Sequence, residues 1–200
     1  TLNSAGFPGH SHSVVTGLSL ENNFWNERIQ NVAGVKGYYY SIKADDDGEK
    51  RIQQLTDNYA ENKDFGYSEN LRVKVIDDLS VVKQFAVKGG YQHSLRFPTR
   101  EEIFGDGMYV QCSPNLKPEK SDNFTAGAEL DMRQIPLLLK LHLEFNWFYL
   151  LMEDRIYWNN YASVPRPYYN SVGTKATGFE IDASIDVNEY ISLSYNLTKQ

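Results

Sequence analysis

Residues 139–149 read LKLHLEFNWFY and alternate between apolar and polar side chains. Because successive side chains of a β-strand point to opposite sides, this alternation divides the stretch between two faces. One face carries Leu139, Leu141, Leu143, Phe145, Trp147 and Tyr149, and the other carries Lys140, His142, Glu144 and Asn146. A helix would scatter these charges around its axis and leave no apolar stripe. The stretch therefore predicts a strand with one apolar face.

The same alternation recurs in other parts of the chain. It is clear in residues 71–75, 84–91, 123–130, 178–185 and 191–197, and it is less regular near 13–25 and 29–43. We count about eight strands and no convincing helix, which predicts an all-β, antiparallel fold.

The predicted connections between these strands are short and long in turn. Tight turns are expected near 26–27, 77–78, 132–136 and 188–189, and long polar loops near 44–64, 94–121 and 152–171. Soluble β-sandwiches have short loops at both ends, whereas transmembrane barrels have short periplasmic turns and long extracellular loops. The pattern favours a partial transmembrane β-barrel over residues 1–200, with an apolar face on lipid and a polar face towards a wet lumen. A soluble antiparallel sheet with one wet face is the alternative.

Composition excludes several classes of protein and site. The net charge of −6 and the pI of about 5.2 argue against a nucleic-acid surface, which is normally basic. Cys112 is the only cysteine, so the chain has no internal disulfide and no cysteine-rich zinc site. A transmembrane helix is not predicted either, because there is no run of about 18 apolar residues.

No catalytic constellation is evident in the sequence. We find no Ser/His/Asp order, no close carboxylate pair and no phosphate-binding glycine loop, and we predict no enzyme, no cofactor and no metal site. The acidic run 45–49 lacks the spacing of a calcium loop, and His10 and His12 lack an evident third ligand. His142 is expected to be a hydrated residue of the lumen wall.

Residues 96–123, RFPTREEIFGDGMYVQCSPNLKPEKSDN, resemble a barrel signature of TonB-dependent outer-membrane receptors. The family shows an Arg-x-Pro-x-x-x-Glu-(Leu/Ile)-Phe-Gly element, then Asn-Pro-x-Leu-x-Pro-Glu-x-Ser, then a strand. The matching positions are Arg96, Pro98, Glu102, Ile103, Phe104, Gly105, Asn115, Leu116, Lys117, Pro118, Glu119, Ser121 and Gly127. Ser113-Pro114-Asn115-Leu116 departs from the family's more usual Gly-Asn-Pro-Asp-Leu. Weaker matches follow at Asn170, Gly173, Gly178 and Glu180 and in the stretch SLSYNLTKQ.

The resemblance implies a receptor in the outer membrane of a Gram-negative bacterium that imports a scarce nutrient, such as an iron–siderophore complex. Its partners would be the TonB complex, the nutrient and outer-membrane lipid. Barrels of this transporter type have about 22 strands and a plugged lumen. With about eight strands and no plug, the chain is expected to be an internal fragment of the barrel, and TonB would act through the missing N-terminal part. A soluble all-β carbohydrate-binding module and a passive porin-like channel are the alternatives.

The resemblance and the loop positions predict two groups of functional residues. Residues expected to fix the loop against the barrel rim are Arg96, Pro98, Glu102, Phe104, Gly105, Leu116, Pro118 and Glu119. Loops carried on a scaffold supply most ligand contacts, and aromatic rings and arginines suit sugars, catecholate-like ligands and anionic chelates. Candidates for ligand binding are Arg100, Asp106, Tyr109, Tyr157, Trp158, Tyr161 and Arg166, and Arg96 is a further possible contact.

Overall fold

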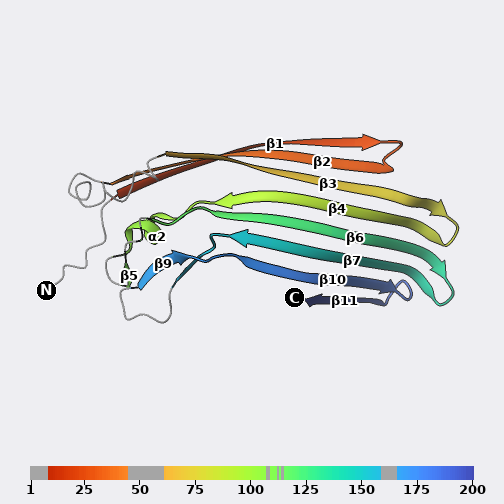
Figure 1. The fold of residues 1–200 in the computed structure, drawn as a ribbon. Helices are drawn as coiled ribbons and strands as arrows, with labels where there is room; N and C mark the ends of the chain where they lie inside the picture. The colour runs from red at the N-terminus through yellow and green to blue at the C-terminus, as the bar shows by residue number, and fades with distance from the viewer. Residues whose placement is uncertain (1–8, 45–60, 107–108, 112, 114, 159–165) are drawn as a thin grey trace.

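The computed structural model describes residues 9–44, 61–106, 109–111, 113, 115–158 and 166–200, and most of them form one long antiparallel sheet. Its strands follow the order β1-β2-β3-β4-β6-β7-β10-β11, so each strand pairs with its neighbours along the chain (Figure 1). The strands are β1 Gly9–Phe24, β2 Ile29–Ala44, β3 Glu61–Leu79, β4 Val82–Arg96, β6 Glu119–Ile135, β7 Leu138–Glu153, β10 Thr174–Asp186 and β11 Ser192–Lys199. The prediction of an all-β, antiparallel sheet of about eight strands is confirmed.

Short connections join the strands at one end of the sheet, here called the turn end. They lie at residues 25–28, 80–81, 136–137 and 187–191, and Figure 1 shows them together on the right. The turn predicted at 77–78 is therefore misplaced by three residues. Asp77 pairs with Gln84 in the ladder, and the positive φ of Ser80 (49°) supports the turn instead. The turn within 132–136 lies at its last residue, Pro136, which has no N–H to give to a ladder.

Long connections lie at the opposite end, here called the loop end. Residues 97–118 contain the short helix α2 (Arg100–Phe104) and β5 (Val110–Gln111), and residues 154–173 contain β8 (Ile156–Trp158) and β9 (Arg166–Asn170). Strands β5, β8 and β9 form a small sheet in the order β5-β9-β8. Most of the predicted loop 44–64 lies outside the described residues, and from Glu61 onwards it belongs to β3. Helix α2 corrects the expectation of no helix.

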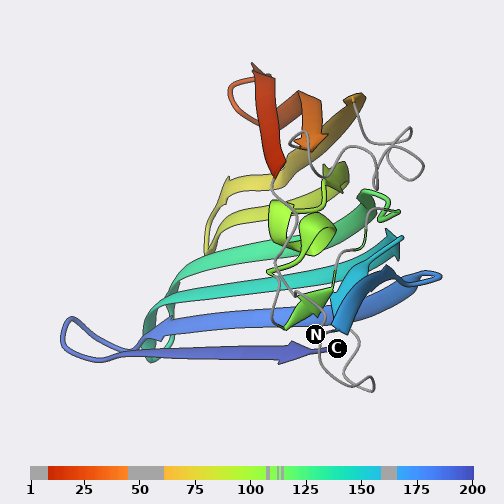
Figure 2. The same cartoon turned by 90° about the vertical axis from the view of Figure 1, so that its left-hand side faces the viewer.

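The large sheet is a curved wall with two different faces, as the view from the loop end shows (Figure 2). The row of paired residues through Phe145 is apolar, and it includes Val87, Ala128, Ile181 and Leu197. The next row is polar, and it runs through Arg72, Lys88, Gly127, Asn146, Glu180 and Thr198. We call these the apolar face and the polar face.

The apolar face is open from β1 to β11 and has no second layer among the described residues. Leu18 is 86% exposed, and Phe65 and Leu193 are also exposed. A soluble monomer rarely leaves so extended an apolar surface uncovered. None of the helices within the described residues has the length and apolar character needed to span a membrane.

The buried core lies at the loop end, between the sheet and α2. It consists of Tyr40, Ile42, Ile103 and Phe104, with Phe97 packed against it. Figure 2 shows α2 and β5 in front of the strands at this end. Three of these five residues, Phe97, Ile103 and Phe104, come from the 96–123 stretch.

Candidate functional site

Arg96 links three elements at the loop end through two carboxylates. Its guanidinium donates to Glu119 at the start of β6, with Nε–Oε2 2.8 Å and Nη2–Oε1 2.9 Å. It also donates to Glu102 of α2, with Nη1–Oε2 3.1 Å. The planar guanidinium can hold two carboxylates at once because its donors form a rigid fork. We call Arg96, Glu102 and Glu119 the rim cluster.

Both carboxylates of the rim cluster also accept backbone N–H groups. Glu102 accepts from the N–H of Thr99 (2.7 Å) while the Thr99 hydroxyl accepts from the N–H of Glu102, so the two residues form a capping box that begins α2. Glu119 accepts from the N–H of Ile156 in β8 at 2.6 Å. The cluster therefore connects the large sheet, the helix and the second long loop.

The pKa of Glu119 reflects these contacts. Burial raises it, but the hydrogen bonds from Arg96 and from the Ile156 N–H outweigh burial and hold the pKa below its usual value. Hydrogen bonding to Glu119 raises the pKa of Arg96, against the opposing effect of burial. Both groups are therefore charged at neutral pH.

An apolar core supports the rim cluster from below. The ring of Phe97 stacks on Tyr40 with centroids 4.9 Å apart and planes 7° apart. Ile103 and Phe104 of α2 are almost fully buried, 1% and 2% exposed. Burial and the nearby Glu102 carboxylate raise the pKa of Tyr40 to about 12, so its hydroxyl stays neutral. The core fixes α2 on the sheet and with it the position of Glu102.

The two long loops are joined to one another by side-chain and backbone hydrogen bonds. Asn170 accepts from the N–H of Lys117 (2.7 Å) and donates to the carbonyls of Lys117 and Asp154. The Ser113 hydroxyl accepts from the N–H of Tyr168 at 3.0 Å. The N–H of Arg166 donates to the carbonyl of Tyr109 at 2.8 Å. Residues 97–118 and 154–173 therefore form one assembly.

The structure brings the predicted motif residues together in this assembly. Pro98, Phe104 and Leu116 are buried, and Pro118 is half-buried next to Glu119. Gly105 has a φ of 75°, which an L side chain rarely adopts, and its N–H donates to the carbonyl of Glu101 to end α2. Gly127 lies on the polar face, where a Cβ would come within 2.5 Å of the Asn146 side chain.

The predicted ligand contacts are arranged around the small sheet. Tyr109, Tyr157 and Trp158 are exposed, and the Arg166 guanidinium lies 5.3 Å from the centre of the Trp158 ring. Arg100 is exposed on α2. Asp106 accepts the N–H groups of Tyr109 and Val110, so its carboxylate shapes the turn before β5. Tyr161 lies outside the described residues.

Sequence reasoning missed two tyrosines of β9. Tyr169 is 42% exposed beside Tyr157, and Tyr168 lines a groove of about 430 Å³ with Ser113, Leu116 and Asn170. Burial, followed by the nearby Glu101 and Glu102 carboxylates, raises the pKa of Tyr168. The stretch RPYYN, with aromatic residues next to Arg166, carried the signal that could have identified them.

The polar face carries a second group of ion pairs, which we call the wall network. Arg72 of β3 donates to Glu129 of β6 at 3.0 Å, and Lys88 of β4 pairs with Glu144 of β7. Gln84 donates to Glu129 at 3.0 Å. A hollow of about 460 Å³ lies beside Arg72, Lys88 and Glu180. The wall network therefore links β3 with β6 and β4 with β7 through side chains.

Comparisons with known proteins agree with this architecture. A family described as TonB dependent receptor-like, beta-barrel, matches residues 3–200. Among solved structures, a copper transporter named OprC superposes with a TM-score of 0.66 and 17% identity, over 96% of this chain and 29% of that chain. The Serratia marcescens hemophore receptor HasR, solved with its hemophore HasA and heme, superposes with a TM-score of 0.69 and 14% identity, over 98% of this chain and 35% of that chain. The chain thus spans about a third of these structures. No curated protein sequence matches the chain significantly.

Proposed function

The chain belongs to the family of TonB-dependent receptor-like β-barrels, and we propose that it is part of an outer-membrane receptor that imports a scarce nutrient such as an iron–siderophore complex. The observation that carries the proposal is a single-layered sheet with an exposed apolar face on one side and a charged polar face on the other. The apolar face is exposed from Leu18 in β1 to Leu197 in β11, while the polar face holds the wall network. Lipid on one side and a wet lumen on the other satisfy both faces.

The sheet has an orientation in this proposal. The loop end faces the outside of a Gram-negative bacterium, and the turn end faces the periplasm. A tilted strand crosses the bilayer with roughly 9–11 residues, and β3, β4, β6 and β7 are longer than that, so they project beyond the membrane at the loop end. Arg96 and Glu119, at the loop-end tips of β4 and β6, stand outside the hydrocarbon region.

The partners follow from the family and from the open edges of the sheet. The outer strands β1 and β11 each have one unpaired edge within the described residues, and a membrane sheet must satisfy such an edge. We assign the pairing of these edges to the remaining strands of the same barrel. Energy would come through the TonB complex, acting on a part of the receptor outside this sequence.

The small sheet is the proposed contact surface for the nutrient. Tyr109, Tyr157 and Trp158 present aromatic rings, and Arg166 adds a cation beside the Trp158 ring. Rings and guanidinium groups bind planar and anionic chelates by stacking and by charge-assisted hydrogen bonds. The rim cluster, in contrast, already uses its donors and acceptors on the protein, so its proposed role is to hold the rim.

A deletion of the full gene tests this function. Growth on iron–siderophore complexes as the iron source should fail in the deletion strain and return with the intact gene. It should fail equally when TonB is disrupted. Growth that depends on the gene but not on TonB would indicate a passive channel instead. A gene product that fractionates as a soluble carbohydrate-binding protein would contradict the proposal altogether.

A further inference from the structure

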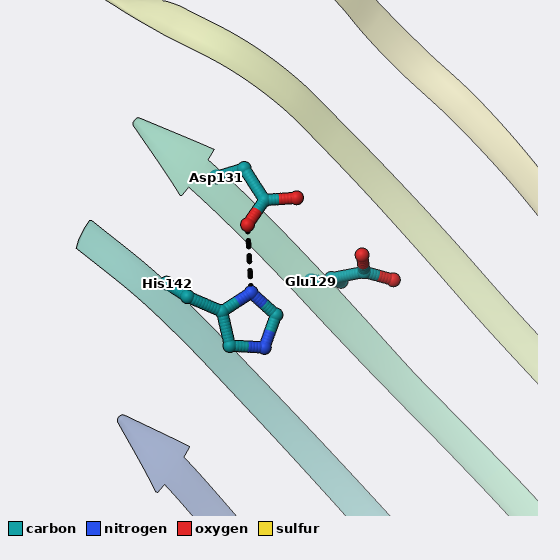
Figure 3. A group of neighbouring side chains, drawn as sticks. All are labelled: Glu129, Asp131 and His142. Carbon is teal, nitrogen blue, oxygen red and sulfur yellow. Dashed lines mark hydrogen bonds and ion pairs between the residues drawn. The ribbon is translucent and has the colours of Figure 1, made fainter. Parts of the chain in front are cut away.

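Three potential metal ligands meet on the polar face near the turn end. Glu129 and Asp131 lie on β6, and His142 lies on β7 directly opposite Asp131 (Figure 3). One ligand atom from each residue lies within 4.8 Å of the others. Alternation places all three on the same side, because residues 129 and 131 are two positions apart and His142 pairs with Asp131. Among the described residues this is the one such group.

We propose that Glu129, Asp131 and His142 bind a divalent transition-metal ion, Zn²⁺ or Cu²⁺. One imidazole and two carboxylates form a mixed nitrogen and oxygen ligand set, which suits these ions better than Ca²⁺ or Mg²⁺, whose ligands are oxygens. Metal–ligand bonds of about 2.0–2.2 Å place two ligands of one ion at most about 4.4 Å apart. Closing the group from 4.8 Å therefore requires only small side-chain rotations.

The surroundings of His142 hold its ring in place for binding. Nδ1 lies 2.7 Å from Asp131 Oδ1, and Nε2 lies 3.8 Å from Glu144 Oε2. Carboxylates on both sides of an imidazole are common around metal sites, where one binds the ion and another orients the ring. Glu144 is therefore placed as an orienting residue or as a fourth ligand.

Charges of both signs surround the group. The carboxylates of Glu129, Asp131 and Glu144 lie beside Arg72 and Lys88, and the pocket next to Asp131 adds Lys83, Arg133 and Lys140 together with Asp186. The Glu129 carboxylate accepts three hydrogen bonds from Arg72 and one from Gln84, so an ion must displace one of them to bind Glu129. The Asp131 carboxylate has only His142 and a 3.5 Å contact from Gln84.

An ion can reach the group from solvent. A pocket of about 300 Å³ opens beside Asp131 and His142, and Lys83, Arg133, Lys140 and Asp186 also line it. The side chains of Glu129, Asp131 and His142 are 18%, 27% and 35% exposed, so the ligands are neither sealed off nor fully hydrated. Partial burial of this kind limits competition from water for the same atoms.

A second histidine–aspartate pair provides a matched control. His93 Nδ1 lies 2.8 Å from Asp122 Oδ1, but this pair lies on the apolar face. The Asp122 carboxylate also accepts from the Tyr91 hydroxyl. The pair has the same geometry between ring and carboxylate without a second acidic ligand. Loss of metal binding on substitution of His142, but not on substitution of His93, would assign the ion to the proposed site.

The test is a Zn²⁺ titration of the full-length receptor, purified in detergent and stripped with EDTA, by isothermal calorimetry. H142Q should remove one equivalent of Zn²⁺ or weaken it by at least about 100-fold, since even outer-shell partners contribute 10- to 100-fold. H93Q should bind like the unchanged protein. Equal Zn²⁺ binding by H142Q and the unchanged receptor, equal losses in both variants, or no Zn²⁺ bound at all would overturn the proposal.

Two further measurements keep the test decisive. Heat-modified gel mobility shows whether each variant forms the barrel, and D131N replaces H142Q if the latter does not fold. Retention of full Zn²⁺ affinity by folded D131N would then count against the site. With Cu²⁺, the electron paramagnetic resonance spectrum should show nitrogen coupling that is lost in H142Q and kept in H93Q.

Discussion

The rim cluster and the wall network contain the same kinds of charges in different surroundings. In the rim cluster Arg96 joins Glu102 of α2 to Glu119 of β6, and in the wall network Arg72 and Lys88 pair with Glu129 and Glu144 across the sheet. The rim glutamates are 12% and 13% exposed and also accept backbone N–H groups, whereas the wall glutamates are 18% and 25% exposed and contact only side chains. The rim cluster lies over an apolar core, and the wall network lies on a single-layered sheet.

This difference indicates that the rim carboxylates are needed for the structure of the loop end, whereas the wall carboxylates can be replaced at a smaller cost in stability. Removing a rim carboxylate leaves a backbone N–H without an acceptor inside a packed assembly. Removing a wall carboxylate leaves side chains that can turn to water. A buried N–H group without an acceptor lowers the free energy of unfolding by about 1–3 kcal/mol, whereas an exposed ion pair contributes about 0–1 kcal/mol.

The largest effect is expected from Phe104→Ala. The ring is 2% exposed in the core beneath α2, and truncating a buried phenylalanine costs about 3–5 kcal/mol. Since the strands keep their ladder, the loop end should open while the barrel remains. The measurement is cleavage of the 97–118 loop by an external protease in intact membranes. Phe145→Ala, which shortens a half-exposed ring on the apolar face, should leave cleavage unchanged, and faster cleavage there would contradict the assignment of the core.

The strands and their faces could be predicted because both follow from neighbouring residues. Alternation in LKLHLEFNWFY is a local property, and it correctly placed β7 and its two faces. The helix α2 was missed although Thr99 and Glu102 carry the spacing of a capping box, because five residues are too few to show a helical stripe. The turn at 77–78 was misplaced because the Asp77-Asp78 pair was interpreted as a turn, whereas Asp77 pairs with Gln84 and β3 continues to Leu79.

The contacts that organise the loop end could not be predicted, because they join residues far apart in the chain. Glu119 meets the N–H of Ile156 across 37 positions, and Asn170 meets Lys117 across 53. The residue types in the rim motif were identified, but their partners depend on how the two loops pack. The same holds for His142, whose partner Asp131 is determined by strand register.

Glu119→Gln compared with Glu144→Gln tests the contrast between rim and wall directly. The rim variant loses its ion pair with Arg96 and weakens the acceptor of the Ile156 N–H, so we expect a cost of about 1–3 kcal/mol. The wall variant should cost no more than about 1 kcal/mol. Protease protection of the loop end in the full-length receptor measures both. Equal losses would show that the two clusters do not differ in the way described.

Acid should lower the stability of the loop end by protonating Glu119. The folded pKa of Glu119 is lowered from its ordinary value of 4.5, so its charged form contributes stability above that pH. This contribution falls as the pH drops below the ordinary value towards the folded one. Protease protection of the unchanged receptor should therefore decline as the pH falls below about 4.5. Glu119→Gln should show a flatter profile, and identical profiles would exclude Glu119 as the titrating group.

The smallest effect is expected at the proposed nutrient surface. Trp158→Ala removes an exposed ring and its contact with Arg166, and an exposed cation–π contact is worth about 0.5–1 kcal/mol. The apparent affinity for the nutrient identified by growth should fall by about two- to fivefold in whole-cell uptake, with surface expression unchanged. Trp25→Ala, an equally simple truncation at the turn end, should have no effect on uptake. A reduction of the same size in both variants would remove the small sheet from the proposed contact surface, because the loss would then arise from the barrel as a whole.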